Sequence, residues 1–200
     1  MRMLTAAALL VAAIPATAVA NPKATMKKAQ TLEVSSAVFS DKGDIPARYT
    51  CDGEGDTPSL QWSRAPAGTA SIAVTVQDPD APKKTFTHWL VTDIPGNVTS
   101  IGGGTGVPQG ARELKNDSGT DGWSGPCPST GRHHYVFTVY ALDTLLPTVV
   151  TADNFASAIK GHVLAEGKLT GMYQRSSTNA GTQRTHDDDR SRPGMTAPHG

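Results

Sequence analysis

The amino-acid sequence predicts a single, mainly β domain. Its 200 residues are 38% hydrophobic and 18% charged, which is typical of one soluble globular domain with a sizeable core. Short segments rich in Val, Ile, Thr and Tyr recur between clusters of Gly and Pro, as in LEVSSAVF, SIAVTVQD, THWLVTDI and HYVFTVYAL. This pattern is typical of β-strands. One segment near the C-terminus changes to the period of a helix.

The N-terminal segment predicts export. Residues 1–20 combine Arg2, an apolar stretch and the small-residue pattern Ala18-Val19-Ala20, as a secretory signal peptide does. The apolar stretch, about eleven residues long, is shorter than the roughly twenty that a membrane-spanning helix needs. Residues 21–31 are polar and basic, which predicts a flexible lead-in. We therefore expect a periplasmic or secreted protein without a membrane span, with its domain over residues 32–175.

Strand alternation predicts two unlike faces for the segment SIAVTVQD. The first face, with Ile72, Val74 and Val76, should belong to the core. The second face, with Ala73, Thr75 and Gln77, should be less deeply buried. The Gly- and Pro-rich stretches CDGEGDTPS and 102–131 predict loops over most of their length. Loops this long in a compact domain usually carry function.

The C-terminal part predicts a helix, a strand and a tail. TADNFASAIKGHV places Phe155, Ile159 and Val163 at four-residue steps behind Thr151 as the N-cap. GKLTGMYQR is predicted to follow as a final strand. Residues 176–200 have almost no apolar side chain to bury, which predicts a disordered tail. The HDDDR within this tail is interpreted as a solvated charge cluster rather than a metal site.

Charge and cysteine content restrict the function classes. Eighteen Lys and Arg balance eighteen Asp and Glu, so the basic surface that nucleic acid requires is not predicted. Cys51 and Cys127 are the only cysteines. Export to an oxidising compartment permits a disulfide between them, but their spacing fits two buried free thiols equally well. Two cysteines alone lack the four ligands of a structural zinc site.

The stretch QDPDAPKKTFTHWLVTDIP contains the first candidate site residues. On a strand from residue 85 to residue 94, alternation places His88 on the same side as Phe86 and Leu90. Such a histidine is either a core residue with one hydrogen bond or a donor at a pocket wall. Asp78, in Asp78-Pro79-Asp80, fits a proline turn as well as a site.

The stretch SGPCPSTGRHHYVFTVYALD contains the second group. His133 and Tyr135 stand two apart at the entrance of a predicted strand, so both should project to one side. Gly125 and Pro126 form a turn ahead of them. If this group meets Asp78 and His88, the site would combine several hydrogen-bond donors with an orienting carboxylate. Such a site suits a small anion, and a phosphate monoester more than an uncharged ligand.

Five ordered blocks resemble the bacterial branch of the phosphatidylethanolamine-binding protein family, the Raf kinase inhibitor-like proteins. They are YTCDGEGDTPSLQW, QDPDAP, THWLVTDIP, SGPCPSTGRHHYVFTVYALD and HVLAEGKLTGMYQR, over about residues 32–175. The resemblance implies an antiparallel β-sandwich with peripheral helices and a small anion pocket at one end. It implies a non-catalytic protein that binds phosphate-bearing headgroups or similar anions, without a cofactor.

The resemblance also implies roles for single positions. Asp78 matches the pocket aspartate of the DPDAP block, and His88 matches the histidine of the following strand. His133 and Tyr135 match the family's G-x-H-R-Y motif, while Gly125 and Pro126 match the pocket rim. This chain departs from the motif at His134, which takes the place of the usual arginine and should point away from the pocket.

Other functions have weaker support in the sequence. GWSGP ends in proline where a G-x-S-x-G nucleophile elbow needs glycine, and H-E-x-x-H is absent. Paired Asp78 and Asp80 stand in a proline turn without a third catalytic group. A metal site at His133 and His134 is disfavoured, because adjacent strand residues face opposite ways. Inhibition of a protease or kinase remains the alternative that the resemblance suggests.

Overall fold

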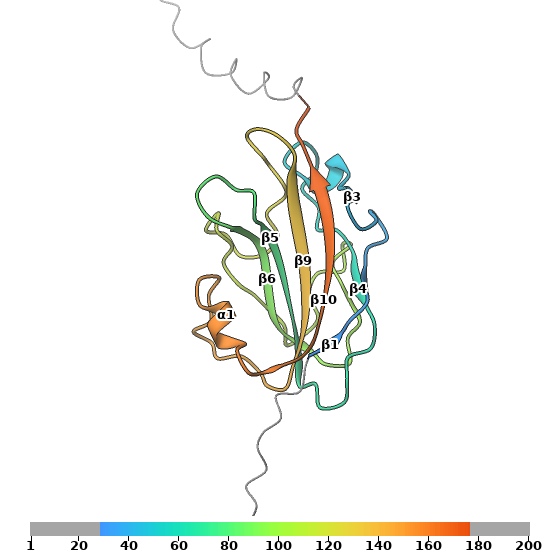
Figure 1. Ribbon diagram of the computed structural model, residues 1–200, viewed down its shortest axis with the longest axis vertical. Helices are drawn as coiled ribbons and strands as arrows, with labels where there is room; N and C mark the ends of the chain where they lie inside the picture. Colours follow the sequence, from blue (N-terminus) through green and yellow to red (C-terminus); the bar gives the residue numbers. More distant parts are fainter. Residues whose placement is uncertain (1–28, 177–200) are drawn as a thin grey trace, which may run out of the picture.

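The computed structural model describes residues 29–176, which fold into two β-sheets (Figure 1). Four long strands form the centre of the larger sheet: β5 (Ser71–Asp78), β6 (Phe86–Pro95), β9 (His133–Leu142) and β10 (Val163–Tyr173). The remaining elements are short: β1 (Gln30–Thr31), β2 (Val34–Ser35), β3 (Gly43–Asp44), the 3₁₀ helix η1 (Ala47–Tyr49), β4 (Leu60–Trp62), β7 (Ser100–Ile101), β8 (Arg112–Glu113) and α1 (Phe155–Ala158).

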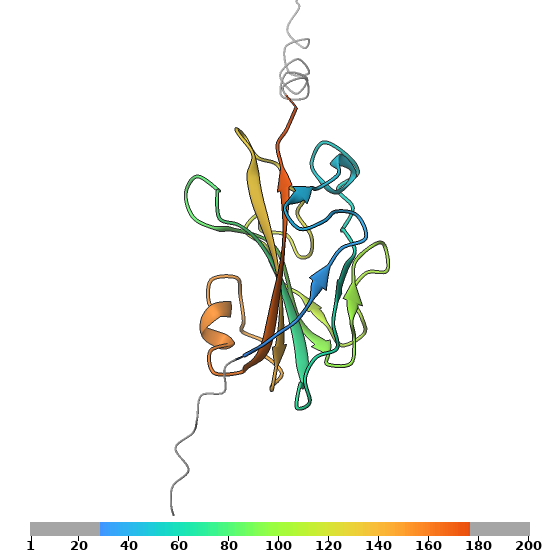
Figure 2. The same cartoon turned by 45° about the vertical axis from the view of Figure 1, so that its right-hand side comes forward.

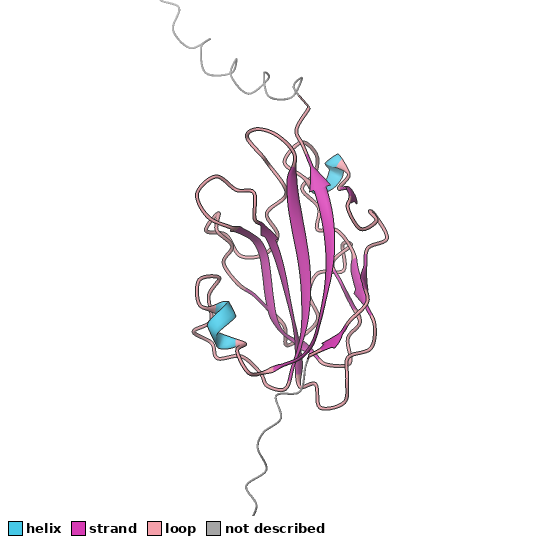
Figure 3. Ribbon diagram, in the orientation of Figure 1, coloured by secondary structure: helices cyan, strands magenta, loops and turns pink. Residues whose placement is uncertain are grey.

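The larger sheet has the strand order β1-β10-β9-β5-β6-β8, with β3 also paired to β10, and the smaller sheet has the order β2-β4-β7. The pairs among the four long strands are all antiparallel. Within the described part, strands dominate and the helices are single turns, as Figure 3 shows. The predicted fold class, a mainly β antiparallel sandwich with peripheral helices, is confirmed.

Both faces of the larger sheet are buried. The main core lies between the sheets, where aliphatic residues of β5 meet residues of the smaller sheet such as Leu60 and Trp62. A second cluster lies on the other face and joins Ala73 and Leu90 to Phe155 of α1. The prediction of a less deeply buried second face of β5 is therefore wrong at Ala73 and Thr75, which are 0% and 2% exposed. Sequence alternation did not reveal that α1 and its flanking loops cover this face.

A register shift in β6 changes the direction of one candidate residue. Val76 of β5 pairs with Trp89, but the next residue of β5 pairs with Thr87, so β6 carries one extra residue at His88. Such a bulge locally interrupts the alternation of a strand. His88 therefore contacts aromatic residues on the main-core side, while Leu90 packs in the second cluster. The prediction that His88 and Leu90 share a face is wrong for this reason.

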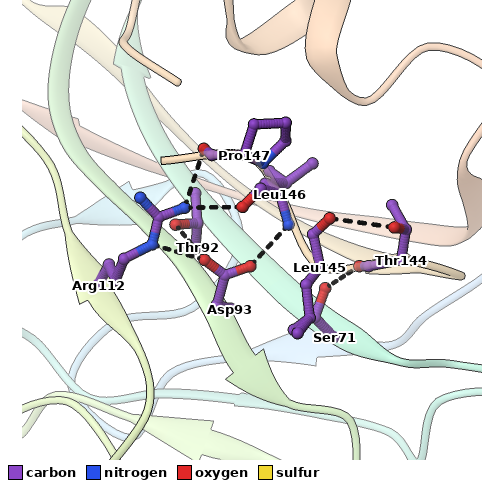
Figure 4. A network of polar contacts seen from close by, with 8 residues as sticks. All are labelled: Ser71, Thr92, Asp93, Arg112, Thr144, Leu145, Leu146 and Pro147. Atoms are coloured by element: carbon purple, nitrogen blue, oxygen red, sulfur yellow. Dashed lines mark hydrogen bonds and ion pairs between the residues drawn. The ribbon is translucent and has the colours of Figure 1, made fainter. Parts of the chain in front are cut away.

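A second irregularity of β6 lies at Asp93, a non-glycine residue with φ of 59°. Its carboxylate accepts hydrogen bonds from Arg112 Nε at 2.7 Å and from the Leu146 backbone N–H at 2.8 Å (Figure 4). Arg112 also donates to the carbonyls of Leu146 and Pro147 at 3.1 and 3.2 Å. This network, the Asp93 network, fixes β6, β8 and the loop before α1 to one another.

The helix near the C-terminus is shorter than predicted. It begins at Phe155 rather than after Thr151, because the Asn154 side chain accepts a hydrogen bond from the Thr151 backbone N–H and holds the preceding residues in a turn. Gly161, with φ of 86°, follows the helix. Val163 is therefore the first residue of β10 and no longer part of the helix. The prediction that Thr151 is the N-cap is therefore wrong, because Asn154 takes this position.

The N-terminal end of the described chain already belongs to the sheet. Gln30 and Thr31 pair in parallel with Ala165 and Glu166 of β10, so the chain is ordered two residues before the predicted start of the domain. The two ends of the described chain lie at opposite ends of the long axis, as Figures 1 and 2 show. The predicted signal peptide, most of the lead-in and nearly all of the tail lie outside the described residues.

Candidate functional site

The candidate site is a cavity of about 300 Å³ at the end of the domain far from α1, where β5 ends and β6 and β9 begin. Five of the six residues predicted for the site line it: Asp78, His88, Gly125, His133 and Tyr135. The sixth, Pro126, does not line the cavity. Its carbonyl instead accepts a hydrogen bond from the Cys51 N–H at 3.1 Å.

His133 and Asp78 form a buried pair on one wall. His133 Nδ1 lies 2.7 Å from Asp78 Oδ2, and its Nε2 lies 3.1 Å from the carbonyl oxygen of Thr130. Both ring nitrogens therefore face hydrogen-bond acceptors, and an imidazolium can donate to both. The second oxygen of Asp78 accepts from the Asp80 backbone N–H at 2.8 Å. The pair is thus fixed in position by the turn after β5 and the loop before β9.

His88 is held differently. Its Nδ1 lies 2.6 Å from the carbonyl oxygen of Ser124, so this nitrogen donates. Burial lowers the pKa of His88, although the hydrogen bond to Ser124 and the nearby Asp78 and Asp117 carboxylates act in the opposite direction. At neutral pH the ring is therefore uncharged and its Nε2 is an acceptor. No described residue forms a hydrogen bond with this nitrogen.

Tyr135 supplies the least satisfied polar group of the site. Its side chain is 0% exposed, its ring contacts the His88 ring edge-on at 5.2 Å, and its hydroxyl has no hydrogen-bond partner among the described residues. Burial raises the pKa of Tyr135, with the Asp78 charge as the next cause. The hydroxyl consequently remains protonated at physiological pH and can donate to a ligand.

The remaining wall is a loop held by a disulfide. Cys51 and Cys127 are joined, which resolves the two alternatives that their spacing left open. Gly125 allows the close approach of this loop to the η1 segment, because a Cβ at Gly125 would lie 3.0 Å from Thr50 Cα and Tyr49 O. The disulfide and the glycine together fix the rim of the cavity relative to the η1 segment.

His134 points away from the cavity, on the outer side of β9. Its side chain is half exposed, and its Nδ1 and backbone N–H both lie within hydrogen-bond distance of Asp80 Oδ2, at 2.7 and 2.8 Å. The backbone N–H and then the side chain of His134 lower the pKa of Asp80. His134 thus pairs with a carboxylate of the DPDAP turn. It supports the turn that positions Asp78 and does not line the cavity.

Sequence reasoning missed several lining residues, namely Ala81, Pro82, Phe86, Ser118, Ser124, Cys127, Pro128 and Ser129. Three of them stand in the PCPS stretch, directly after the predicted rim Gly125-Pro126, and this adjacency could have identified them. Ser118 gave no such signal. It reaches the site because its loop folds back and its hydroxyl donates to Ser124 Oγ at 2.9 Å.

Residues 29–176 contain neither a metal-ligand cluster nor a membrane-spanning helix. No group of three or more His, Cys, Asp or Glu side chains lies together as metal ligands do. His133 and His134 bind different carboxylates, which separates the two residues considered as a metal pair. Over the same residues, none of the helices has the length and apolar character to cross a bilayer.

The fold and the cavity define a β-sandwich protein with a small cavity at one end. The family model described as phosphatidylethanolamine-binding protein matches residues 35–174. The chain belongs to this family.

Relatives and solved structures agree with this assignment. A UPF0098 protein of Methanothermobacter thermautotrophicus is 43% identical over 72% of this chain and 99% of its own length. The phosphatidylethanolamine-binding protein homologue CT736 of Chlamydia trachomatis has a TM-score of 0.69 at 31% identity, covering 74% of this chain and all of that chain. Escherichia coli YbcL, described as a member of the mammalian family, has a TM-score of 0.67 at 33% identity, covering 72% and 99%.

One relative is named as a lipoprotein. A protein of Mycobacterium tuberculosis, 38% identical over 76% of this chain and 81% of its own length, carries a name, LppC, that designates it a candidate lipoprotein.

Proposed function

We propose that this protein is an exported, non-catalytic binding protein whose cavity holds a phosphate-type anion, either a free phosphate or a phospholipid headgroup. Export rests on the signal-peptide pattern of residues 1–20. The volume of about 300 Å³ suits a small headgroup and is too small for a protein segment. The cavity therefore favours the small-ligand function over the inhibition of a protease or kinase.

The observation that carries the proposal is the buried Tyr135 hydroxyl without a partner. A buried, unsatisfied polar group costs about 1–3 kcal/mol, so its presence at a cavity wall indicates a ligand that accepts its hydrogen bond. Phosphate oxygens are strong acceptors. The neutral His88 Nε2 can accept from a protonated phosphate oxygen, and it can donate once the ring is protonated.

The geometry also supports a binding role over a catalytic one. Asp78 and His133 resemble the acid and base of a catalytic triad, but His133 Nε2 faces the Thr130 carbonyl at 3.1 Å, where a triad would place a nucleophile. Cys127, the cysteine at the cavity, is bonded to Cys51 and cannot act as a thiolate.

Isothermal titration with inorganic phosphate, phosphoethanolamine and ethanolamine tests the proposal. We expect the two phosphates to bind and ethanolamine not to bind. Tighter binding of phosphoethanolamine than of inorganic phosphate would identify a headgroup as the ligand. Affinity should increase as the pH falls below about 6.5, the ordinary pKa of histidine, because imidazolium is the better anion partner.

The matched variants are His88→Gln and His162→Gln. His162 pairs with Asp143 at 2.8 Å on an exposed surface, so its loss controls for the removal of a histidine elsewhere in the domain. We expect phosphate affinity to fall about tenfold in His88→Gln and to stay unchanged in His162→Gln. Equal affinity in both variants, or no binding at any pH between about 5 and 8, would contradict the proposal.

A further inference from the structure

A second cavity, of about 490 Å³, shares no residue with the candidate anion site. Three parts of the chain form it: η1 with the segment that follows it, the paired strands β6 and β8, and the glycine-rich loop 102–106. The loop packs closely against residues 57–59, since a Cβ at Gly102 would lie 2.3 Å from the Pro58 carbonyl oxygen. This wall is therefore backbone in contact with backbone, which fixes the shape of the cavity.

The charged residues of this second cavity leave one negative charge unpaired. Arg48 and Asp56 bind one another, with Arg48 Nε 2.7 Å from Asp56 Oδ2. Glu113 remains, and within residues 29–176 no Lys, Arg or His lies in ion-pair contact with it. An anionic ligand would be repelled by Glu113, whereas a cation would be attracted.

The Glu113 carboxylate is held in place. It accepts a hydrogen bond from Nε1 of the buried Trp89 at 2.8 Å. Gly122 also lies close to this carboxylate, since a Cβ there would be 3.3 Å from Oε1 and 3.4 Å from Oε2. A carboxylate fixed in this way loses little conformational freedom when a ligand binds.

An aromatic side chain stands in the same cavity. Tyr49, at the end of η1, is half-buried and packs against the main core. An aromatic ring and a carboxylate in one cavity are the combination that recognises organic ammonium groups, through cation–π attraction and charge pairing. A hard divalent cation would need several oxygen ligands, and only one unpaired carboxylate is present among the residues that line the cavity.

We propose that this second cavity binds an organic ammonium ion through the Glu113 carboxylate and the Tyr49 ring. The site is independent of the proposed anion site, because neither Glu113 nor Tyr49 lines that cavity. The protein would then hold an amine and an anion at two separate places.

The experiment compares choline with 3,3-dimethyl-1-butanol, its uncharged analogue of the same shape, at constant ionic strength. Binding is followed by isothermal titration and by tryptophan fluorescence, because Trp89 touches the site. We expect choline to bind the full chain with millimolar affinity and the uncharged analogue to bind at least about tenfold more weakly. Equal affinity for the two compounds, or no detectable choline binding at concentrations up to about 50 mM, would overturn the proposal.

Variants locate the binding. Glu113→Gln keeps an acceptor for Trp89 and removes the charge, so we expect choline affinity to fall about tenfold, and Tyr49→Leu should lower it about threefold. Glu33→Gln is the matched control, since Glu33 is exposed, forms no ion pair within the described residues and lies outside the cavity. Thermal unfolding checks that each variant is folded.

His88→Gln should bind choline like the unaltered protein, which separates this site from the anion site. Unchanged choline affinity in folded Glu113→Gln would refute the assignment.

Discussion

The Asp93 network and the candidate cavity are two polar regions at opposite ends of β6, and they differ in how fully their polar groups are hydrogen-bonded. Both carboxylate oxygens of Asp93 accept hydrogen bonds, and Arg112 donates to a carboxylate and two carbonyls. In the cavity, the Tyr135 hydroxyl has no partner among the described residues. A network that is complete within the chain stabilises the fold, whereas an incomplete one has capacity for a ligand.

The two regions also differ in how β6 is distorted. At Asp93 the irregular residue turns its side chain toward neighbouring loops and binds them (Figure 4). At His88 the extra residue turns a ring toward Tyr135 and the cavity. At both places β6 carries one extra residue relative to β5. At one end this residue binds neighbouring loops, and at the other it directs a ring into the cavity.

The largest expected effect concerns the disulfide that fixes the cavity end. Reduction of the Cys51–Cys127 bond should lower the free energy of unfolding by about 4 kcal/mol, because the closed loop restricts the unfolded chain. Urea unfolding with and without reductant measures it. The double variant Cys51→Ser, Cys127→Ser should show the lower stability and no response to reductant. Equal stability of the oxidised and reduced forms would show that the cavity end does not depend on this bond.

The next effect tests whether the Asp93 network is structural. Arg112→Met keeps the apolar stem and leaves the Asp93 carboxylate, 10% exposed, without its cation. We expect a loss of about 3 kcal/mol in the free energy of unfolding. The control is Arg48→Met, whose exposed pair with Asp56 should contribute less than about 1 kcal/mol. Similar losses in the two variants would remove the distinction between a buried network and a surface pair.

A smaller effect tests the incomplete region. Tyr135→Phe removes a hydroxyl that has no partner in the described chain, so the free energy of unfolding should change by less than about 1 kcal/mol or increase. Phosphate affinity should fall about tenfold in the same variant. Urea unfolding and isothermal titration give the two values. A large loss of stability with unchanged affinity would mean that the hydroxyl serves the fold.

The smallest effect concerns pH. Burial lowers the pKa of His88 in the folded protein, so its stability contribution is full above the unfolded value of about 6.5 and is lost as the pH falls toward the folded pKa. Between pH 6.5 and 5.5 the loss is at most about 1 kcal/mol. Unfolding measured at both pH values should show a smaller decrease for His88→Gln than for the unaltered protein. Identical decreases would show that His88 titrates normally.

The sequence predicted the long strands well. SIAVTVQD corresponds to β5 residue for residue, because β-branched side chains and alternation reflect local preferences that need no partner. LEVSSAVF was predicted as a strand, but only its residues Val34–Ser35 form one. The short strand Arg112–Glu113 was not predicted, since two residues carry no period. The helix was predicted too long, because local turn contacts of Asn154 and Gly161 restrict it.

For the site, the sequence predicted five residues that line one cavity. The direction of the His88 side chain could not be predicted, because it depends on the bulge in β6. Proximity of Asp78 and His133, separated by 55 positions in the chain, follows from β5 lying beside β9. The resemblance of ordered motifs anticipated this proximity, whereas spacing by itself did not. The second cavity had no counterpart in the sequence interpretation.

The sequence by itself determined the strand-forming segments, the family motifs and the chemical types of the candidate residues, because these depend on side-chain chemistry and local backbone preference. Tertiary structure alone decided the pairing of Cys51 with Cys127, the burial of both sheet faces and the missing partner of the Tyr135 hydroxyl. These features depend on contacts between segments far apart in the chain. Such contacts form only when strands pair and loops pack, and local sequence preference does not encode them.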